Sequence, residues 1–486
     1  MRNLTLLTDL YELTMMQGYF RNAGMNETVI FDAFYRSNPQ GGGYAISAGL
    51  AQIIEYIKDL HFTEDDIDYL RGLNIFEEDF LEYLHEFRFT GDIYAIPEGR
   101  VIFPREPLVK VIAPVMQAQL IETALLNILN HQCLIATKAS RIVRAAAGDG
   151  VMEFGSRRAQ GPDAAIYGAR AAMIAGCVGT SNVLCGQMFD VPVSGTHAHS
   201  WIMSFPDELT AFRAYAKLYP DACILLIDTY DTLDSGLKNA ITVFKEMRDA
   251  GIKSKKYGIR MDSGDLAYLS KKVKAALDAE GFTDAIISAS NDLDEDLIQS
   301  LKQQGATINS WGVGTNLITS KDCPAFGGVY KLAAIQDKTT GEFIPKIKIS
   351  ENAEKITNPG DKTIYRIRDN EGMIIADFIT LTDEKFDPND PLMLFDPIET
   401  WKKTLLEGGS YTMEEIMVHV FHNGECIYES PKVMELQQIC KKELASLWEE
   451  SKRFHNPHQT YVDLSKKLWN LKNDLLEQYQ FGIRRK

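Results

Sequence analysis

Two histidines follow a short apolar run near the middle of the chain. Residues 191–201 read VPVSGTHAHSW, in which the apolar run ends at Gly195 and is followed by Thr196, His197 and His199. This pattern predicts a buried strand that ends in a loop, which is where barrel enzymes carry their catalytic groups. An imidazole at such a position can act as a base, a nucleophile or a metal ligand.

A metal site is one interpretation of His197 and His199, because H-x-H pairs at strand ends bind metals in barrel hydrolases. Such sites also need imidazoles from later strands, and this chain has no histidine between Ser200 and Val418. The sequence therefore argues against a barrel metallohydrolase. A loop without chemistry is the other interpretation, and it depends on whether other segments supply partners for the histidines.

A second segment supplies cations and an aromatic ring. Residues 151–163 read VMEFGSRRAQGPD, an apolar start followed by a glycine and two adjacent arginines. Adjacent arginines are usually only solvated charge. Here Phe154 and Arg157 follow a predicted strand, so the ring and the guanidinium would project at the same edge as the histidines. Together they suit a planar anion.

A third segment, residues 259–266, reads IRMDSGDL and places Arg260 two residues before Asp262 at the end of an apolar strand. Side chains two apart in extended backbone point to the same side, so this pair can bind a phosphate and a diol respectively. A structural salt bridge between the two side chains is the alternative.

Two later loops could hold phosphate. The apolar strand at 285–290 runs into NDLDEDLIQSL, where Ser290 or Asn291 can cap the helix predicted to follow. The next strand ends in Gly312, Gly314 and Thr315, and glycines there let backbone amides approach an anion. Phosphate sites commonly form after the last strands of a barrel.

The elements that would position these groups alternate along the chain. Apolar strand candidates occur at residues 151–154, 191–195, 223–228, 257–262, 285–290 and 307–314, with helical segments between them. This alternation predicts parallel βα units and an irregular TIM-like α/β barrel. We therefore expect a smaller N-terminal α/β domain over residues 1–130, the barrel over 131–330, and a C-terminal β-rich and helical region over 331–486. Amphipathic helices are expected at 433–450 and 461–479.

Composition excludes several classes of protein. The chain of 486 residues can bury more than one core, and its net charge of −16 disfavours nucleic acid and anionic membranes as partners. No apolar run approaches the roughly 18 residues of a membrane span, and the first residues lack a signal-peptide pattern. Seven cysteines without a C-x-x-C pair favour reduced thiols. We expect a cytoplasmic enzyme.

Taken together, these segments resemble those of the nicotinate phosphoribosyltransferase family. Besides the motifs above, the resemblance includes TDLYELTM at 8–15, GTSNVL at 179–184 and GVGT at 312–315, and it extends in order from residue 6 to about 366. It implies transfer of the 5-phosphoribosyl group from phosphoribosyl pyrophosphate to nicotinate. The products would be nicotinate mononucleotide and diphosphate, in the first step of NAD salvage from nicotinate.

The resemblance also implies roles for single residues. His199 matches the histidine that relatives phosphorylate with ATP, whereas His197 matches a packing position. Arg260 and Asp262 match residues at the base or phosphate and at the ribose, and count with His199 as catalytic. The nicotinate contacts are Tyr11, Phe154, Arg157, Ser181 and Thr196. The contacts of phosphoribosyl pyrophosphate are Lys138, Asp262, Ser290, Asn291, Gly312, Gly314 and Thr315. Residues 122–140 also resemble quinolinate phosphoribosyltransferase, and this resemblance implies that Lys138 and the nearby Arg141 contact diphosphate.

Mg²⁺ bound through diphosphate is the expected cofactor, and ATP the expected co-substrate. Residues 224–236, ILLIDTYDTLDSG, look like the phosphoribosyl pyrophosphate loop of another transferase class, but its adjacent acids are missing because Asp228 and Asp231 are separated. Two interpretations of Asp228 remain open. It is either a ligand of magnesium or ribose, or a structural residue.

The expected partners are small molecules and a second copy of the chain. In relatives the residue matching Tyr11 reaches into a neighbour's site, which implies a homodimer with shared active sites. Within the class, the nicotinamide and quinolinate enzymes are the alternatives. Nicotinamide-using relatives carry an aspartate where this chain has Ser181, so the acid is the expected substrate. A non-catalytic phosphate-binding regulator is the alternative outside the class.

Overall fold

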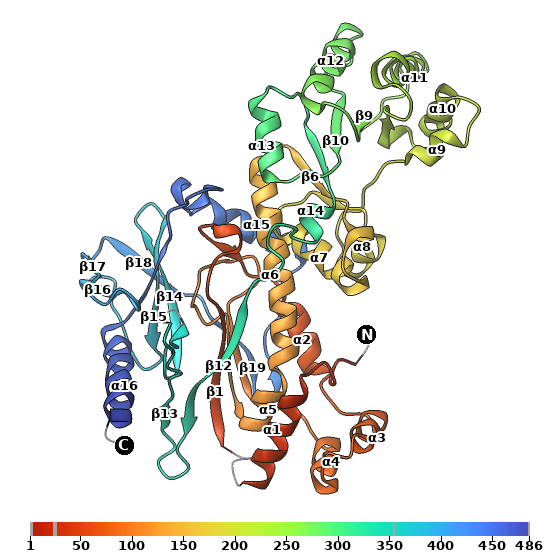
Figure 1. The fold of residues 1–486 in the computed structure, drawn as a ribbon. Helices are drawn as coiled ribbons and strands as arrows, with labels where there is room; N and C mark the ends of the chain where they lie inside the picture. The colour runs from red at the N-terminus through yellow and green to blue at the C-terminus, as the bar shows by residue number, and fades with distance from the viewer. Residues whose placement is uncertain (1–2, 23–26, 353–354, 485–486) are drawn as a thin grey trace. The chain divides into compact units, whose positions relative to one another are not determined.

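The computed structural model describes residues 3–22, 27–352 and 355–484, and the chain folds as two compact units (Figure 1). Unit 1 holds residues 1–134, 325–431 and 438–486, and unit 2 holds residues 135–324 and 432–437. The chain passes from unit 1 into unit 2 within the long helix α6 (Glu122–Ala145). No helix of the described ranges is long and apolar enough to cross a membrane.

Unit 2 is built on a six-stranded parallel sheet in the order β7-β6-β11-β10-β9-β8. The strands are β6 (Gly150–Glu153), β7 (Gly179–Thr180), β8 (Cys223–Leu226), β9 (Tyr257–Met261), β10 (Ile286–Ser290) and β11 (Ser310–Val313). Their buried side chains are largely apolar, as with Ile259, Ile287 and Trp311, because helices cover a parallel sheet. The alternating βα units agree with the prediction from the sequence.

The helices of unit 2 connect these strands (Figure 1). They are α7 (Pro162–Ile174), α8 (Val183–Phe189), α9 (His199–Met203), α10 (Glu208–Leu218), α11 (Leu237–Asp249), α12 (Leu266–Ala279), α13 (Glu295–Gln303) and α14 (Thr315–Ile318). Asp207, Asp265 and Asp294 cap α10, α12 and α13, each accepting a backbone N–H of the first turn.

One predicted strand of this sheet is wrong. Residues 191–195 make only a single bridge, Thr180 to Val193, and the strand beside β6 is β7, which the sequence did not suggest. The physical reason is Pro192, which has no N–H to donate to a ladder, although its carbonyl accepts from Thr180 N at 3.0 Å. In the described residues the hydrogen-bonded sheet is thus open, with β7 and β8 as its edges.

Unit 1 contains a seven-stranded antiparallel sheet in the order β13-β12-β1-β5-β3-β19-β20. The strands are β1 (Thr28–Tyr35), β3 (Asp92–Ala95), β5 (Val109–Pro114), β12 (Gly328–Gln336), β13 (Phe343–Pro345), β19 (Val418–His422) and β20 (Glu425–Cys426). Segments far apart in the sequence therefore share one sheet. A two-stranded sheet, β2 (Ala45–Ile46) with β4 (Val101–Ile102), and helices α1 (Leu10–Arg21), α2 (Leu50–Lys58), α3 (Glu64–Gly72), α4 (Glu78–His85) and α5 (Val115–Leu120) complete this part.

The remainder of unit 1 is a second sheet in the order β17-β16-β21-β15-β14-β18. Its strands are β14 (Lys362–Asp369), β15 (Ile374–Leu381), β16 (Leu392–Phe395), β17 (Lys403–Leu406), β18 (Tyr411–Glu415) and β21 (Tyr461–Leu464). Helix α16 (Lys466–Arg484) belongs to the same unit, whereas α15 (Val433–Ala445) begins in unit 2 and continues into unit 1. The helix expected from residue 461 begins only at Lys466, because Val462 and Leu464 are buried in β21 beside β15.

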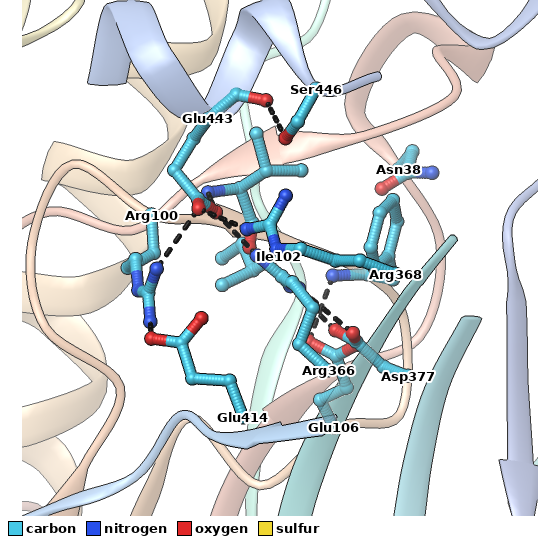
Figure 2. A network of polar contacts seen from close by, with 12 residues as sticks. Asn38, Arg100, Ile102, Glu106, Arg366, Arg368, Asp377, Glu414, Glu443 and Ser446 are labelled. Atoms are coloured by element: carbon cyan, nitrogen blue, oxygen red, sulfur yellow. Dashed lines mark hydrogen bonds and ion pairs between the residues drawn. The ribbon is translucent and has the colours of Figure 1, made fainter. Parts of the chain in front are cut away.

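A buried ionic network ties this second sheet to α15 (Figure 2). Arg366 of β14 is fully buried and pairs with Asp377 of β15 and Glu443 of α15. Arg100 and Arg368 also donate to Glu443. A buried charge is tolerated only with paired and hydrogen-bonded partners, so the network fixes α15 against the strands.

Candidate active site

Two pockets lie at the carboxyl ends of the unit 2 strands, and they share part of their lining. The larger, which we call the histidine pocket, has a volume of about 430 Å³, and the smaller, the glycine pocket, about 160 Å³. Both are lined by Phe154, Arg157, Arg260 and Asp262. The histidine pocket adds Ser181, Thr196, His197 and His199, and the glycine pocket adds Ser290, Asn291, Gly312, Gly314 and Thr315. All predicted site residues except Tyr11, Lys138 and Asp228 therefore line one of these pockets.

Arg260 stands at the junction of the two pockets, and its guanidinium is held on every edge. Nε donates to Ser290 Oγ at 2.8 Å, Nη1 to Thr196 Oγ1 at 2.9 Å and Nη2 to Asp262 Oδ1 at 3.1 Å. The salt bridge with Asp262, which was the structural alternative, is thus present, but it is one of three contacts. Arg260 Cζ also lies 5.8 Å from the centre of the Phe154 ring. A planar cation fixed beside an aromatic ring suits a planar anion.

Phe154 forms a floor that depends on Gly312. The ring lies so close to Gly312 that a Cβ at this position would be 2.6 Å from Cδ2 and 2.8 Å from Cε2 of Phe154. The Phe154 N–H donates to Val313 O at 2.8 Å, which extends the pairing of β6 with β11 by one residue. Gly312 therefore provides room for the ring as well as access to backbone amides.

Glu153 organises this floor and was missed in the sequence. Its carboxylate accepts from Thr180 Oγ1 at 2.6 Å and from the backbone N–H of Gly155, and its carbonyl accepts from Ser181 N at 3.0 Å. Burial raises the pKa of this carboxyl group. An acidic residue inside the apolar run VMEF was the available signal, since a buried carboxyl group requires such partners.

His199 is the first residue of α9 and is partly exposed to the histidine pocket. Its Nδ1 lies 3.0 Å from Thr229 Oγ1, and its Nε2 lies 3.9 Å from Asp262 Oδ2. When Nδ1 carries the ring proton and donates it to Thr229, Nε2 presents the free lone pair of a nucleophile. Thr229 follows β8 and was not singled out in the sequence, where only the nearby acids drew attention.

His197 has a different environment, although it is only two residues away. Its Nε2 accepts from Leu226 N at 3.3 Å, and its ring packs against Tyr215 with ring centres 4.6 Å apart. Burial lowers the pKa of His197 to about 4, so the ring is neutral near pH 7. These contacts agree with a packing role.

The two carboxylate oxygens of Asp228 have different environments. Its Oδ2 accepts from Asp262 N at 2.8 Å and from Ser263 Oγ at 2.7 Å, which is a structural role at the end of β9. Its Oδ1 is buried and has no hydrogen-bond partner within the described part of the chain. A carboxylate oxygen left free in this way fits a hard cation such as Mg²⁺.

The predicted helix cap at Ser290 or Asn291 is wrong. The helix α13 begins later, and Asp294 is its cap, accepting from Leu297 N at 2.8 Å. Asn291 and Asp292 have φ of 92° and 44°, so the chain first turns through two left-handed residues. Ser290 instead bonds Arg260 and Asp262.

Lys138 does not reach either pocket. It is 2% exposed, and its Nζ pairs with Glu295 at 2.7 Å and with Asp322 at 2.8 Å. Arg141 donates from Nε to the same Glu295 at 2.7 Å. The expected contact of Lys138 with diphosphate is therefore replaced by a buried ion pair, in which each charge compensates the desolvation of the other.

Tyr11 lies on α1 of unit 1, whereas both pockets are formed by unit 2. Its side chain is 45% exposed. Partial burial and a hydrogen bond to Glu122 raise the pKa of the Tyr11 phenol.

Comparison with known proteins covers the whole length of the chain. The model of the nicotinate phosphoribosyltransferase family matches residues 150–371, and the models of its N-terminal and C-terminal domains match residues 6–130 and 361–472. Nicotinate phosphoribosyltransferase of Bacillus subtilis (strain 168) is 45% identical over 482 residues, 99% of this chain and 97% of that protein.

Two solved structures have a similar fold. The crystal structure of human nicotinic acid phosphoribosyltransferase matches with a TM-score of 0.83 and 28% identity, covering 97% of this chain and 100% of that one. Nicotinate-nucleotide pyrophosphorylase from Pyrococcus furiosus matches with a TM-score of 0.68 and 22% identity, covering 91% and 96% respectively. At this identity the second match supports the fold alone.

Proposed function

Because this chain belongs to the nicotinate phosphoribosyltransferase family, we propose that it transfers the 5-phosphoribosyl group from phosphoribosyl pyrophosphate to nicotinate. The products are nicotinate mononucleotide and diphosphate, and the reaction is the first step of NAD salvage from nicotinate. The observation that carries this proposal is the guanidinium of Arg260, held by three side chains beside the Phe154 ring where the two pockets meet. This arrangement supports binding of a planar carboxylate next to a phosphorylated ribose.

The two pockets divide the substrates between them. The nicotinate ring lies on Phe154 in the histidine pocket, with its carboxylate near Arg157 and the Ser181 hydroxyl. The phosphoribosyl group extends into the glycine pocket, where Gly312, Gly314 and Thr315 offer backbone and hydroxyl donors. Asp262 accepts hydrogen bonds from the ribose hydroxyls.

In the chemical step a bond forms between the nicotinate nitrogen and the anomeric carbon, and the bond from that carbon to diphosphate breaks. The electron pair of the broken bond leaves with diphosphate. A step of this kind depends on orientation and on charge stabilisation more than on proton transfer. The cations Arg157 and Arg260 supply that stabilisation. Bound Mg²⁺ would neutralise charge on the diphosphate, and the free Oδ1 of Asp228 is the residue atom that would help to hold it.

We also propose that His199 couples the reaction to ATP hydrolysis. Its Nε2 attacks the γ-phosphorus of ATP, an N–P bond forms, and ADP leaves with the electrons of the broken P–O bond. The Thr229 contact at Nδ1 supports this role, because it orients the ring and leaves Nε2 toward Asp262. The phosphorylated ring adds negative charge beside Asp262, which would favour binding of Mg²⁺, and this cation would in turn hold the diphosphate anion. Water later hydrolyses the phosphohistidine.

The proposal extends to the partners of the enzyme, which are a second copy of the chain and small molecules. The exposed ring of Tyr11 supports a homodimer in which it completes the pyridine site of the other chain. We expect the enzyme to work in the cytoplasm, where its seven free cysteines stay reduced. Its ligands are small molecules, without nucleic acid or membrane.

Two assays test the proposal. Diphosphate release is measured with nicotinate, nicotinamide and quinolinate, each with and without ATP, and we expect turnover with nicotinate that ATP stimulates. With γ-labelled ATP, His199→Asn should abolish acid-labile labelling and the ATP stimulation but leave slow uncoupled transfer. The matched variant His197→Asn should keep the label. Label that survives in His199→Asn and vanishes in His197→Asn would reverse the assignment.

A further inference from the structure

Three potential metal ligands converge at one edge of the seven-stranded sheet of unit 1. Asp92 is the first residue of β3, and His419 and His422 lie on β19, the neighbouring strand. Asp92 Oδ1 lies 3.2 Å from His422 Nδ1 and 3.7 Å from His419 Nε2, and the three ligand atoms are all within 4.8 Å of one another. Neither pocket of unit 2 includes any of these residues.

A β-bulge is what places the two histidines on one face. Residues three apart on a regular strand point to opposite faces of the sheet. In β19, however, His419 is opposite Tyr94 and Phe421 is opposite Ile93, so two steps along β19 match a single step along β3. The next position along each strand then brings His422 opposite Asp92. Bulges often re-aim side chains in this way near functional sites.

Two of the three spacings between the ligand atoms suit a tetrahedral ion. Two ligands at about 2.0 Å from Zn²⁺ are about 3.3 Å apart in tetrahedral geometry. The distances from Asp92 Oδ1 to the two imidazole nitrogens, 3.2 and 3.7 Å, bracket this value. His419 Nε2 is buried and has no hydrogen-bond partner within the described part of the chain. His419 Nε2 therefore forms no hydrogen bond to Asp92 Oδ1, which lies 3.7 Å away.

Outer contacts already orient both imidazoles. The His419 ring stacks on Tyr94, with ring centres 4.3 Å apart and planes 6° from parallel. His422 Nε2 lies 3.0 Å from the Asn423 amide, so Nδ1 is left to face Asp92. Metal-binding histidines typically have the second ring nitrogen held in this manner. The nearby cation Lys110 is compensated, because its Nζ pairs with Asp361 at 2.6 Å.

We propose that Asp92, His419 and His422 form a Zn²⁺ site that fastens the hairpin of β19 and β20 to β3. Two imidazoles and a carboxylate are a donor set that Zn²⁺ accepts, and His422 is exposed enough for water to complete the coordination. Binding through Nδ1 takes the tautomer of His422 whose ring proton is on Nε2, so the proton moves from Nδ1 to Nε2 and no net proton is released. The Asn423 amide then turns so that its oxygen accepts from Nε2.

The test uses the full-length chain, stripped with a chelator. Zn²⁺ binding is measured by competition with a chromophoric chelator, and Co²⁺ is used as a spectroscopic probe of tetrahedral coordination. We expect one Zn²⁺ per chain, visible Co²⁺ absorption, and a melting temperature that rises with Zn²⁺. His419→Gln and His422→Gln should each weaken binding by more than about 100-fold, because a ligand is lost rather than an outer partner. The matched control His458→Gln removes an exposed histidine elsewhere on the chain and should keep full binding.

A further measurement excludes a trivial result. Circular dichroism of the metal-free variants should match the metal-free wild type, which separates loss of the site from loss of the fold. Absence of Zn²⁺ binding to wild type at micromolar concentration, or binding that neither His419→Gln nor His422→Gln reduces, would overturn the proposal.

Discussion

Gly312→Ala is expected to damage nicotinate binding through the ring of Phe154. A Cβ at residue 312 would lie 2.6 Å from Cδ2 and 2.8 Å from Cε2 of that ring. Carbon atoms in contact are normally about 3.5–4.0 Å apart, so one of the two groups must move by about 1 Å. Gly312 is paired with β10 on one side and β6 on the other, so its backbone is constrained and the ring moves. The displaced ring rises into the space that the pyridine occupies in the proposed function.

A misplacement of about 1 Å can cost about 10²-fold in rate, which corresponds to about 2.7 kcal/mol. We therefore expect kcat/KM for nicotinate to fall about 100-fold at saturating phosphoribosyl pyrophosphate, together with about 1–3 kcal/mol of stability from overpacking. The control is Gly72→Ala at the end of α3, where nothing lies within 4 Å of the added Cβ, and which should keep wild-type kinetics.

A double-mutant cycle isolates the clash. If the ring carries the effect, Gly312→Ala combined with Phe154→Leu should be no worse than Phe154→Leu alone, since the added methyl then meets a smaller side chain. The reasoning is refuted if Gly312→Ala keeps a wild-type kcat/KM. Fully additive losses in the double variant would refute it as well, because the methyl would then act without the ring.

Three other outcomes follow from the same geometry. Burial lowers the pKa of His197 to about 4, against about 6.5 in the unfolded chain, so this residue by itself should cost about 2 kcal/mol of stability at pH 5 relative to pH 7. His197→Gln should remove that part of the slope in urea unfolding at the two pH values, and an unchanged slope would contradict the assignment. Ser181→Asp places a carboxylate near that of nicotinate, where repulsion at about 4 Å and an effective dielectric near 20 is about 4 kcal/mol before screening. We expect at least roughly a tenfold loss of nicotinate kcat/KM; full retention would place substrate discrimination elsewhere. Mixing inactive Tyr11→Ala with inactive Arg260→Ala should restore activity in heterodimers if sites are shared, and verified subunit exchange without recovery would argue against sharing.

The site residues at strand ends could be predicted because their placement depends on local pattern. Arg260 and Asp262 are two apart in an extended segment, so a common direction follows from the backbone alone. The same holds for Phe154 and for Gly312 and Thr315, since parallel strands bring their carboxyl ends to one edge whatever the intervening helices contain. The family resemblance added the chemical roles, which no spacing could supply.

The predictions from the sequence differ from the structure where the position of a residue depends on contacts distant in the chain or on the conformation of a turn. The positive charge of Lys138 is typical of an anion-binding residue. Its partners Glu295 and Asp322, however, lie more than 150 residues later in the chain. The cap of α13 moved from Ser290 to Asp294 because two left-handed residues intervene, and left-handed Asn291 and Asp292 leave only a weak sequence signal. Ion pairs between residues distant in the chain produce no periodic pattern in the sequence, so sequence reasoning does not detect them.

The two histidines show how a local change of backbone alters the chemistry of a motif. Had residues 197–199 stayed extended, both imidazoles would point to one side, as a metal site requires. Instead the chain turns into helix α9 at His199, with Ala198 as the extended residue before it. His197 is therefore buried against Tyr215 and kept neutral, whereas His199 opens to the pocket beside Thr229 and Asp262. A helix start between two equivalent residues thus gives the two imidazoles different environments, one buried and one open to the pocket.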